Sequence, residues 1–241
     1  YNGESVCVQE GRDRTNFNDI QVYAADPWHE TAAASLQMLQ VIAMDSGDVL
    51  VPGATYFTAS PMALVQGTEL VPVDIPLDYD VGFTINPTAA AGGWANIIHI
   101  TADGGNCCNY GQRIPAVWSY GGTTRLHIRD GSVADGNDGC DPEEQLPLNE
   151  DTTVLIDINA NGIEVFYNGE SKCTGNRGGR TTFTQARVFA PDPWHEAAQG
   201  TIDDFYLLPL APTAGCTEPG ACNYDPAAGE DDGSCEMPAA G

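Results

Sequence analysis

A repeat within the chain sets the strongest limit on how it can fold. Residues 1–41 match residues 167–207 without a gap, because Tyr1 aligns with Tyr167 at an offset of 166 positions that stays constant. The motif Tyr-Asn-Gly-Glu-Ser-x-Cys opens both segments, and Asp-Pro-Trp-His-Glu recurs further along each of them. Self-similarity over this length indicates two copies of one structural unit. The second segment is expected to form the last strands of a domain, and the first segment the last strands of an earlier copy.

The region between the two segments has the pattern of successive β-strands. Residues 78–85 alternate polar and apolar side chains, as expected of a strand with one buried face. Asn168-Gly169 is a dipeptide typical of a tight hairpin. The pattern predicts an all-β antiparallel sandwich. Its further strands are expected at residues 95–101, 114–120, 124–129, 153–159 and 163–167, and the repeat also favours strand over helix for residues 32–44.

The sequence divides into three expected parts. Residues 1–45 are the C-terminal strands of a preceding sandwich, residues 46–210 a complete sandwich, and residues 211–241 a linker with a cysteine-rich module. Terminal strands cannot bury their apolar face alone, so an upstream domain or a strand exchange between subunits should complete the first part. The apolar positions expected to cover the two cores are Phe17, Val22, Trp28 and Leu36, with Phe183, Val188, Trp194 and Ile202 as their counterparts.

The repeated Asp-Pro-Trp-His motif allows a functional and a structural interpretation. Its histidine could belong to a ligand or metal site. Alternatively, the motif is a tight turn in which Asp caps, Pro fixes φ and Trp packs on the sandwich, and we favour this interpretation. The motif residues are Asp26, Pro27, Trp28 and His29 in the first copy and Asp192, Pro193, Trp194 and His195 in the second.

Charge excludes several classes of partner. The chain has 34 acidic residues against nine lysines and arginines, a formal net charge of −25. A surface this acidic repels nucleic acid and anionic membranes, but it suits divalent cations, a basic partner or solubility alone. No run of about 18 apolar residues occurs, so no membrane span is expected.

Eight cysteines without a C-x-x-C pair favour disulfides and an oxidising compartment over zinc. Adjacent cysteines rarely bridge each other, so Cys107 and Cys108 are each expected to pair with Cys140 or Cys173. Cys7 has no domain partner in this chain. The tail holds an odd number, Cys216, Cys222 and Cys235, so one is left to pair elsewhere.

Calcium is the only cofactor that the sequence suggests. Hard cations bind several closely spaced oxygens, and two acidic segments supply them: Asp135 with Asp138 in the sandwich, and Asp225 with Asp231 and Asp232 in the tail. Ordinary solvated loops with Asx turns are the alternative.

Catalytic residues are not evident in the sequence. Asp157 and Glu164 lie on adjacent expected strands rather than across a cleft, and no Ser-His-Asp arrangement stands out. His99 and His127 alternate with apolar residues, so each is expected to face away from those residues or to be hydrogen-bonded inside the fold. We expect a protein that is not an enzyme.

The strand segments resemble laminin-G and concanavalin-like jelly rolls. The resemblance lies in Asp78-Tyr-Asp-Val-Gly-Phe, Asn96-Ile-Ile-His-Ile-Thr, Arg113-Ile-Pro-Ala-Val-Trp, Arg125-Leu-His-Ile and Val165-Phe-Tyr-Asn-Gly. With Cys107-Cys108-Asn-Tyr-Gly, Gly136-Asn-Asp-Gly-Cys140 and Asp192-Pro-Trp-His195, the whole unit is similar to the repeats of mastigoneme proteins, which form the tubular flagellar hairs of heterokont algae. The tail resembles a cysteine-rich module of secreted proteins, G-C-T-x-P-x-A-C-N-Y-x-P-x-A-x-x-D-D-G-S-C.

The resemblance implies an extracellular structural subunit of a filament or surface appendage, located at the cell or flagellar surface. Such a subunit would assemble with like subunits through strand or domain completion and disulfides. The alternative function is a lectin-like adhesion module that binds glycans. The side chains that would stack on sugar are Trp94, Tyr110, Trp118 and Tyr120. A glycoside hydrolase is a distant third.

Overall fold

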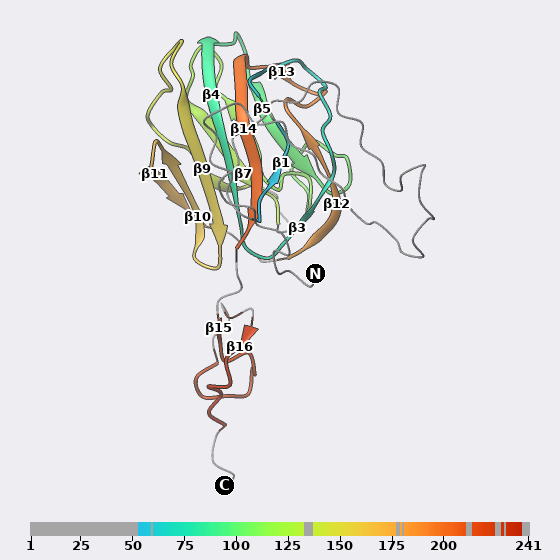
Figure 1. Cartoon of the computed structure of the whole chain (residues 1–241), viewed down its shortest axis with the longest axis vertical. Coiled ribbons are helices and arrows are strands. Elements are labelled where there is room, and N and C mark those ends of the chain that lie inside the picture. The colour runs from blue at the N-terminus through green and yellow to red at the C-terminus, as the bar shows by residue number, and fades with distance from the viewer. Residues whose placement is uncertain are drawn as a thin grey trace, which may run out of the picture. The chain divides into compact units, whose positions relative to one another are not determined.

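The fold is an antiparallel jelly-roll sandwich, as the sequence predicts. The computed structural model describes residues 53–58, 60–132, 137–176, 179, 181–210, 214–224, 228 and 230–237. Every regular element among them is a strand, and no helix that could span a membrane occurs within them. Figure 1 shows β9, β4 and β14 side by side in one layer of the sandwich.

Each layer is one twisted sheet. The first sheet has the order β1 (Thr55–Tyr56), β14 (Gln199–Pro209), β4 (Tyr79–Ala89), β9 (Thr152–Asn159), β10 (Gly162–Tyr167) and β11 (Glu170–Gly175), and β2 (Met62–Ala63) also pairs with β14. The second has the order β3 (Val73–Ile75), β12 (Phe183–Phe189), β5 (Ala95–Thr101), β6 (Ala116–Ser119), β7 (Leu126–Asp130) and β8 (Asp138–Cys140). The short β13 (Glu196–Ala197) pairs with β5 in parallel.

Alternating side chains of the two sheets meet in one core. In β4 the buried positions are Tyr79, Val81, Phe83 and Ile85, and their intervening neighbours face outward. The strands expected from alternation are confirmed, with shifts of a few residues at their ends. The Asn168-Gly169 hairpin is also confirmed, since both residues have the positive φ angles (+50° and +81°) that a two-residue turn of this kind requires.

The repeated segment supplies one interior strand to each sheet, in addition to the edge strand β11. β12 lies between β3 and β5, and β14 lies between β1 and β4. Val188 and Ile202 are fully buried, as expected, and Phe183 is partly buried. Trp194 does not cover the core as Val188 and Ile202 do, because it is 37% exposed; it packs on the sandwich surface against Phe189, as the turn interpretation of its motif predicts.

The first copy of the repeat lies outside the described residues. This applies to Cys7, to the motif Asp26, Pro27, Trp28 and His29, and to the strand expected in residues 32–44. Completion of residues 1–45 by another domain or subunit therefore stays a prediction.

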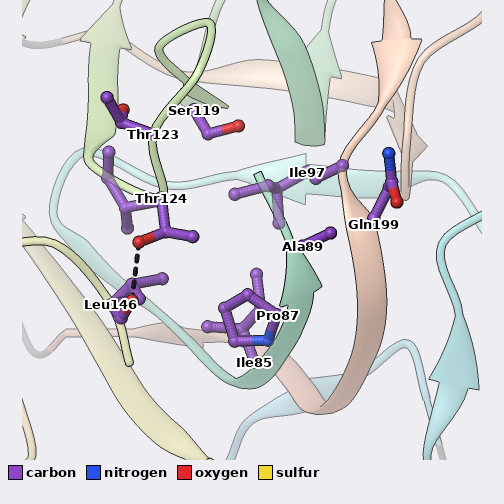
Figure 2. Close-up of a pocket in the computed structure, with 11 residues that line it drawn as sticks. Ile85, Pro87, Ala89, Ile97, Ser119, Thr123, Thr124, Leu146 and Gln199 are labelled. Carbon is purple, nitrogen blue, oxygen red and sulfur yellow. Dashed lines mark hydrogen bonds between the residues drawn. The ribbon is translucent and has the colours of Figure 1, made fainter. Parts of the chain in front are cut away.

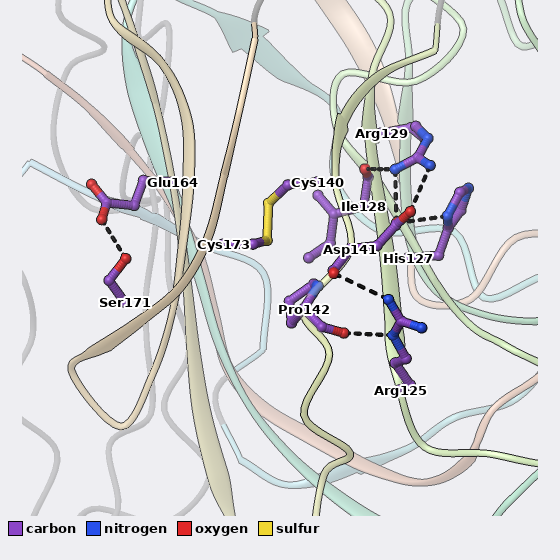
Figure 3. The surroundings of a disulfide bond; sticks show 10 residues. All are labelled: Arg125, His127, Ile128, Arg129, Cys140, Asp141, Pro142, Glu164, Ser171 and Cys173. Carbon is purple, nitrogen blue, oxygen red and sulfur yellow. Dashed lines mark hydrogen bonds and ion pairs between the residues drawn. A yellow bond between two sulfur atoms is a disulfide. The ribbon is translucent and has the colours of Figure 1, made fainter.

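One disulfide joins the two sheets at an edge. Cys140 of β8 is bonded to Cys173 of β11, 33 residues apart in sequence, and these strands end the second and the first sheet (Figure 3). In the tail, the parallel pair β15 (Ala214–Gly215) and β16 (Glu230–Asp231) is accompanied by a Cys216–Cys235 disulfide. Cys222 is free and exposed, so the expectation of one unpaired tail cysteine is confirmed.

Removal of the edge disulfide should destabilise the sandwich. Closing a loop of this length removes about 3–4 kcal/mol of chain entropy from the unfolded state. We expect the double variant Cys140→Ala/Cys173→Ala to lose about that much free energy of unfolding in urea titrations. Reducing agent should weaken the wild type more than the variant, because the variant retains only the Cys107–Cys108 and Cys216–Cys235 bonds. Equal stability of the two proteins would contradict the assignment.

Three carboxylates lie in a row across the outer face of the first sheet. Asp80 of β4 pairs in register with Asp157 of β9, which pairs with Glu164 of β10. Partial burial, and then the charge of Asp157, raise the pKa of Asp80 to about 6. The pKa of Asp157 is also raised, chiefly by burial. The charged form of this row therefore opposes folding.

The substitution Asp80→Asn should stabilise the protein at neutral pH. Because the folded pKa is above the unfolded value of about 3.9, the stability linked to this proton is fully present below pH ~3.9 and lost as pH rises through 6. Allowing for solvent screening, we expect a gain of about 1 kcal/mol at pH 7, or ~2–4 °C in Tm. The gain should vanish near pH 4, and Glu150→Gln, at an exposed position, should show no such pH dependence. A lower Tm for Asp80→Asn at pH 7 would refute this.

Candidate functional site

A buried aspartate organises one end of the second sheet. Asp192 follows β12 in the repeated motif and has no exposed surface. Its Oδ1 accepts the backbone N–H groups of Trp194 (2.9 Å) and His195 (2.8 Å), which is the capped turn that the sequence predicts. Its Oδ2 contacts Nδ1 of His195 at 2.8 Å and Nδ1 of His99 at 2.9 Å. Asn96 of β5 accepts the Asp192 backbone N–H at 2.8 Å.

These contacts keep Asp192 ionised. Burial alone would raise its pKa, but hydrogen bonds from His195 and His99 outweigh burial and hold the pKa well below its usual range. His99 is itself fully buried, and its Nε2 contacts the Gln112 carbonyl oxygen at 2.6 Å. Both ring nitrogens of His99 thus contact oxygen atoms of the protein. The expectation that this histidine is hydrogen-bonded inside the fold is confirmed.

An open pocket of about 390 Å³ lies next to this turn. Its floor belongs to β6 and β7, where Trp118 pairs in register with His127. Val117 and Ile128, beside them in sequence, face the core, so Trp118 and His127 lie on the opposite face of the sheet. Loops and turns around these strands supply the remaining lining residues, which are Trp94, Cys108, Arg113, Asn137 and His195.

Aromatic rings dominate one side of the pocket. Trp94 is 47% exposed, and its ring centroid lies 4.6 Å from that of Tyr120 and 4.8 Å from that of His127. Trp118 is almost fully buried beneath them, and its indole N–H has no acceptor among the described residues. A buried donor without an acceptor is costly and is found mainly at special sites. Tyr110, also expected as a stacking residue, instead packs against Phe183 and is not part of the pocket lining.

Arg113 supplies the positive charge of the pocket. Its side chain is nine-tenths buried, and its guanidinium lies over the Trp118 ring at 4.8 Å from the centroid. Nη1 donates to Oδ1 of Asn137 at 3.0 Å, Nη2 contacts Sγ of Cys107 at 2.9 Å, and Nε reaches the Asn106 carbonyl at 3.4 Å. Burial and the neighbouring Arg129 lower its pKa, although an arginine stays charged at neutral pH.

A carboxylate holds His127. Oδ1 of Asp141 contacts Nδ1 of His127 at 2.8 Å, and both Asp141 oxygens accept from Arg129 at 2.8 and 2.9 Å (Figure 3). Burial, followed by the charge of Arg129, lowers the pKa of His127 to about 4, so the ring is neutral at pH 7. His127 and His195 both contact a carboxylate through Nδ1, and Nε2 of the neutral His127 ring is left as an acceptor.

The disulfide pairing expected for the pocket loop is wrong. Cys107 and Cys108 are bonded to each other rather than to Cys140 and Cys173. The chain permits this because Cys108 adopts a φ of +75°, a left-handed conformation that is rare for residues other than glycine. Backbone of this kind is concentrated at functional sites, and Cys108 lines the pocket.

Those candidate calcium ligands that belong to the described residues do not come together in the fold. No group of three or more His, Cys, Asp or Glu side chains within the described residues could hold a metal ion. Asp231 and Asp232 accept backbone N–H groups of Gly233 and Ser234, as in Asx turns. Asp138 is the first residue of β8, and Asp135 and Asp225 lie outside the described residues. The calcium sites stay predictions.

Other hollows in the described residues are less suited to a ligand. A cavity of about 10 Å³ lies between the sheets, where Ile85, Pro87 and Ile97 converge and Thr124 donates to the Leu146 carbonyl (Figure 2). It has room for about one water molecule. Two surface pockets of about 220 and 150 Å³ have polar and acidic linings without an exposed tryptophan.

Comparisons with known proteins show the fold of this chain but assign no function to the pocket. No protein-family model and no curated protein sequence matches the chain. Domain 4 of the extracellular GH43 arabinanase AbnA of Geobacillus stearothermophilus, solved with arabinotriose, is 13% identical with a TM-score of 0.38, over 64% of this chain and 81% of that domain. The SAP-like pentraxin of Limulus polyphemus is 12% identical (TM-score 0.41; 66% and 76% covered).

A third structure, Trypanosoma rangeli sialidase, is 11% identical with a TM-score of 0.43, and the match covers 67% of this chain but 26% of the sialidase. At these identities the likeness is one of fold alone. The function of the pocket has to be argued from its own residues.

The substitution Asp192→Asn should destabilise the fold. Its amide group would lose acceptor capacity toward His99, His195 and the backbone N–H groups, and each lost hydrogen bond to a buried charged group costs about 1.5–3 kcal/mol. Because the folded pKa of Asp192 is below the unfolded value, its stability contribution is present above pH ~3.9 and lost as pH falls further. We therefore expect a large Tm difference from wild type at pH 7 that narrows at pH 3. The exposed Asp151→Asn should show neither effect, and a pH-independent difference for Asp192→Asn would contradict the argument.

Proposed function

We propose that the sandwich is an extracellular carbohydrate-binding module and that the pocket around Trp94 and Trp118 is its sugar site. The observation that carries the proposal is the exposed Trp94 ring beside a pocket of about 390 Å³ with convergent polar groups. Binding pockets typically have volumes of about 300–1,000 Å³, with apolar walls and a few placed polar groups.

The chemistry of the lining matches that of a sugar. One face of a pyranose ring carries mainly C–H groups, which pack on an aromatic ring, while its edge carries hydroxyl groups. Trp94 is held by Tyr120 and His127, so its ring is positioned before a ligand arrives. Nε2 of His127 can accept from a hydroxyl group, and the amide of Asn137 offers both a donor and an acceptor.

The disulfides support an extracellular location. The described residues contain the bonded pairs Cys107–Cys108, Cys140–Cys173 and Cys216–Cys235. Disulfides persist in oxidising environments such as the extracellular space, which is where most glycans recognised by such modules are displayed.

A tryptophan substitution tests the sugar site. We expect Trp94→Ala to weaken binding to the best ligand of a glycan array by at least about tenfold, which is the ratio for a loss of 1.4 kcal/mol. Isothermal titration calorimetry would measure it, with Tm as a check on folding. The control is Tyr110→Ala, which removes an exposed aromatic ring from the β5–β6 loop that is not part of the pocket lining. Equal losses in both variants, or no glycan binding at all, would overturn the proposal.

A second candidate function is a subunit of an extracellular filament or surface appendage of the mastigoneme type. The observation that favours it is that the duplicated segment corresponds to β11, which ends the first sheet, and to β12 and β14, each of which has a neighbour on both sides. Extra copies of such strands need a partner sandwich, and head-to-tail exchange builds open filaments. The exposed thiol of Cys222 could form a bond between subunits.

Electron microscopy and light scattering on the full chain test this second function. We expect oligomers that dissociate in part when Cys222→Ser and Cys7→Ser are combined under non-reducing conditions. A monomer at all concentrations, in oxidising and reducing buffer, would rule out self-assembly and leave the sugar site unaffected.

A further inference from the structure

We infer that the pocket selects saccharides that carry an anionic group, a carboxylate or a sulfate, and that Arg113 pairs with that group. The inference rests on the proposed sugar site and names the class of sugar that the site takes.

The charge of the pocket lining is opposite to that of the protein as a whole. The full chain has 34 acidic residues and nine lysines and arginines. Within the described residues no aspartate or glutamate lines the pocket, and the charged side chain of the lining is that of Arg113. The carboxylates of Asp141 and Asp192 contact the two lining histidines at Nδ1, so each of these charges is paired with a ring of the pocket. A neutral sugar would not require this arrangement.

Arg113 has donors to spare. A guanidinium carries five N–H groups, and three of them are used in the contacts to Asn106, Asn137 and Cys107. Within the described residues Arg113 makes no ion pair, in contrast to Arg129, which pairs with Asp141, and Arg187, which pairs with Glu69. One N–H therefore remains on each terminal nitrogen, the pair that binds two oxygens of a carboxylate or sulfate.

The Arg113 guanidinium is held in place before an anion binds. The guanidinium is fixed by stacking on Trp118 and by its three polar contacts, so little side-chain entropy is lost when an anion binds. Because the guanidinium is buried, an anion that pairs with it would be shielded from water. Charge-assisted hydrogen bonds are stronger in such a shielded environment.

The net charge of −25 does not prevent binding of an anion at this site. At physiological ionic strength the Debye length is about 8 Å, so exposed carboxylates elsewhere on the surface are largely screened. The groups that a ligand meets at contact distance are those of the lining, among which Arg113 is the charged side chain.

The first test needs no variant. A glycan array with neutral, uronic-acid and sulfated saccharides should yield binders that are mainly anionic. The best anionic binder is then compared with its own neutralised form, the methyl ester for a carboxylate or the desulfated sugar for a sulfate, by calorimetry. We expect neutralisation to weaken binding at least tenfold, and the two derivatives show which anion the site takes.

The second test removes the charge from the protein. Arg113→Gln should abolish the preference for the charged sugar while binding of the neutralised sugar changes little, and Arg113→Lys should retain part of the preference. The matched control is Arg125→Gln, since Arg125 also stacks on an aromatic ring, Tyr120 at 5.2 Å, but does not line the pocket. It should keep the full preference. Tm values establish that each variant is folded.

The outcomes separate this inference from the proposed function. Neutral binders that equal or exceed the anionic ones would overturn the selectivity and leave the sugar site standing. An unchanged preference in folded Arg113→Gln would overturn the role of Arg113. No binding to any glycan would overturn both.

Discussion

The buried carboxylate of Asp192 is the interaction on which the functional end of the sandwich depends. An ionised group without exposed surface must be saturated with hydrogen-bond donors, and here they come from the turn itself and from His99 of the neighbouring β5. Saturating one group therefore fixes the path of the chain after β12, the orientation of two histidines and the junction with β13.

The same arrangement explains how a strongly acidic protein forms a pocket whose described lining has no carboxylate. His195 and His127 present their rings to the pocket while Asp192 and Asp141 contact them at Nδ1. The two carboxylates orient the histidine rings, and it is these rings and Arg113 that line the pocket. The floor is a register pair of two strands, so the site inherits the rigidity of the sheet.

Sequence alone predicts those features that are written in local patterns. The strands follow from alternation, the hairpin from Asn168-Gly169, and the capped turn from the Asp-Pro-Trp-His motif. The pocket does not follow, because Trp94, Arg113, Asn137 and His195 meet only through tertiary structure. Two of the four expected stacking residues, Trp94 and Trp118, line it. The Cys107–Cys108 bond was excluded by a rule of geometry that a left-handed φ at Cys108 overcomes.

The central position of β14 has a consequence for how the protein is made. β14 pairs with β1 and β4, which lie far from it in the sequence. The first sheet therefore cannot close until nearly the whole sandwich has been synthesised. Topologies dominated by such distant pairings fold slowly, in about milliseconds to seconds. During this time the edges of β1 and β4 are open to a β14-like strand from any neighbouring copy. In a chain built from repeats, correct assembly thus depends on the order in which the strands leave the ribosome.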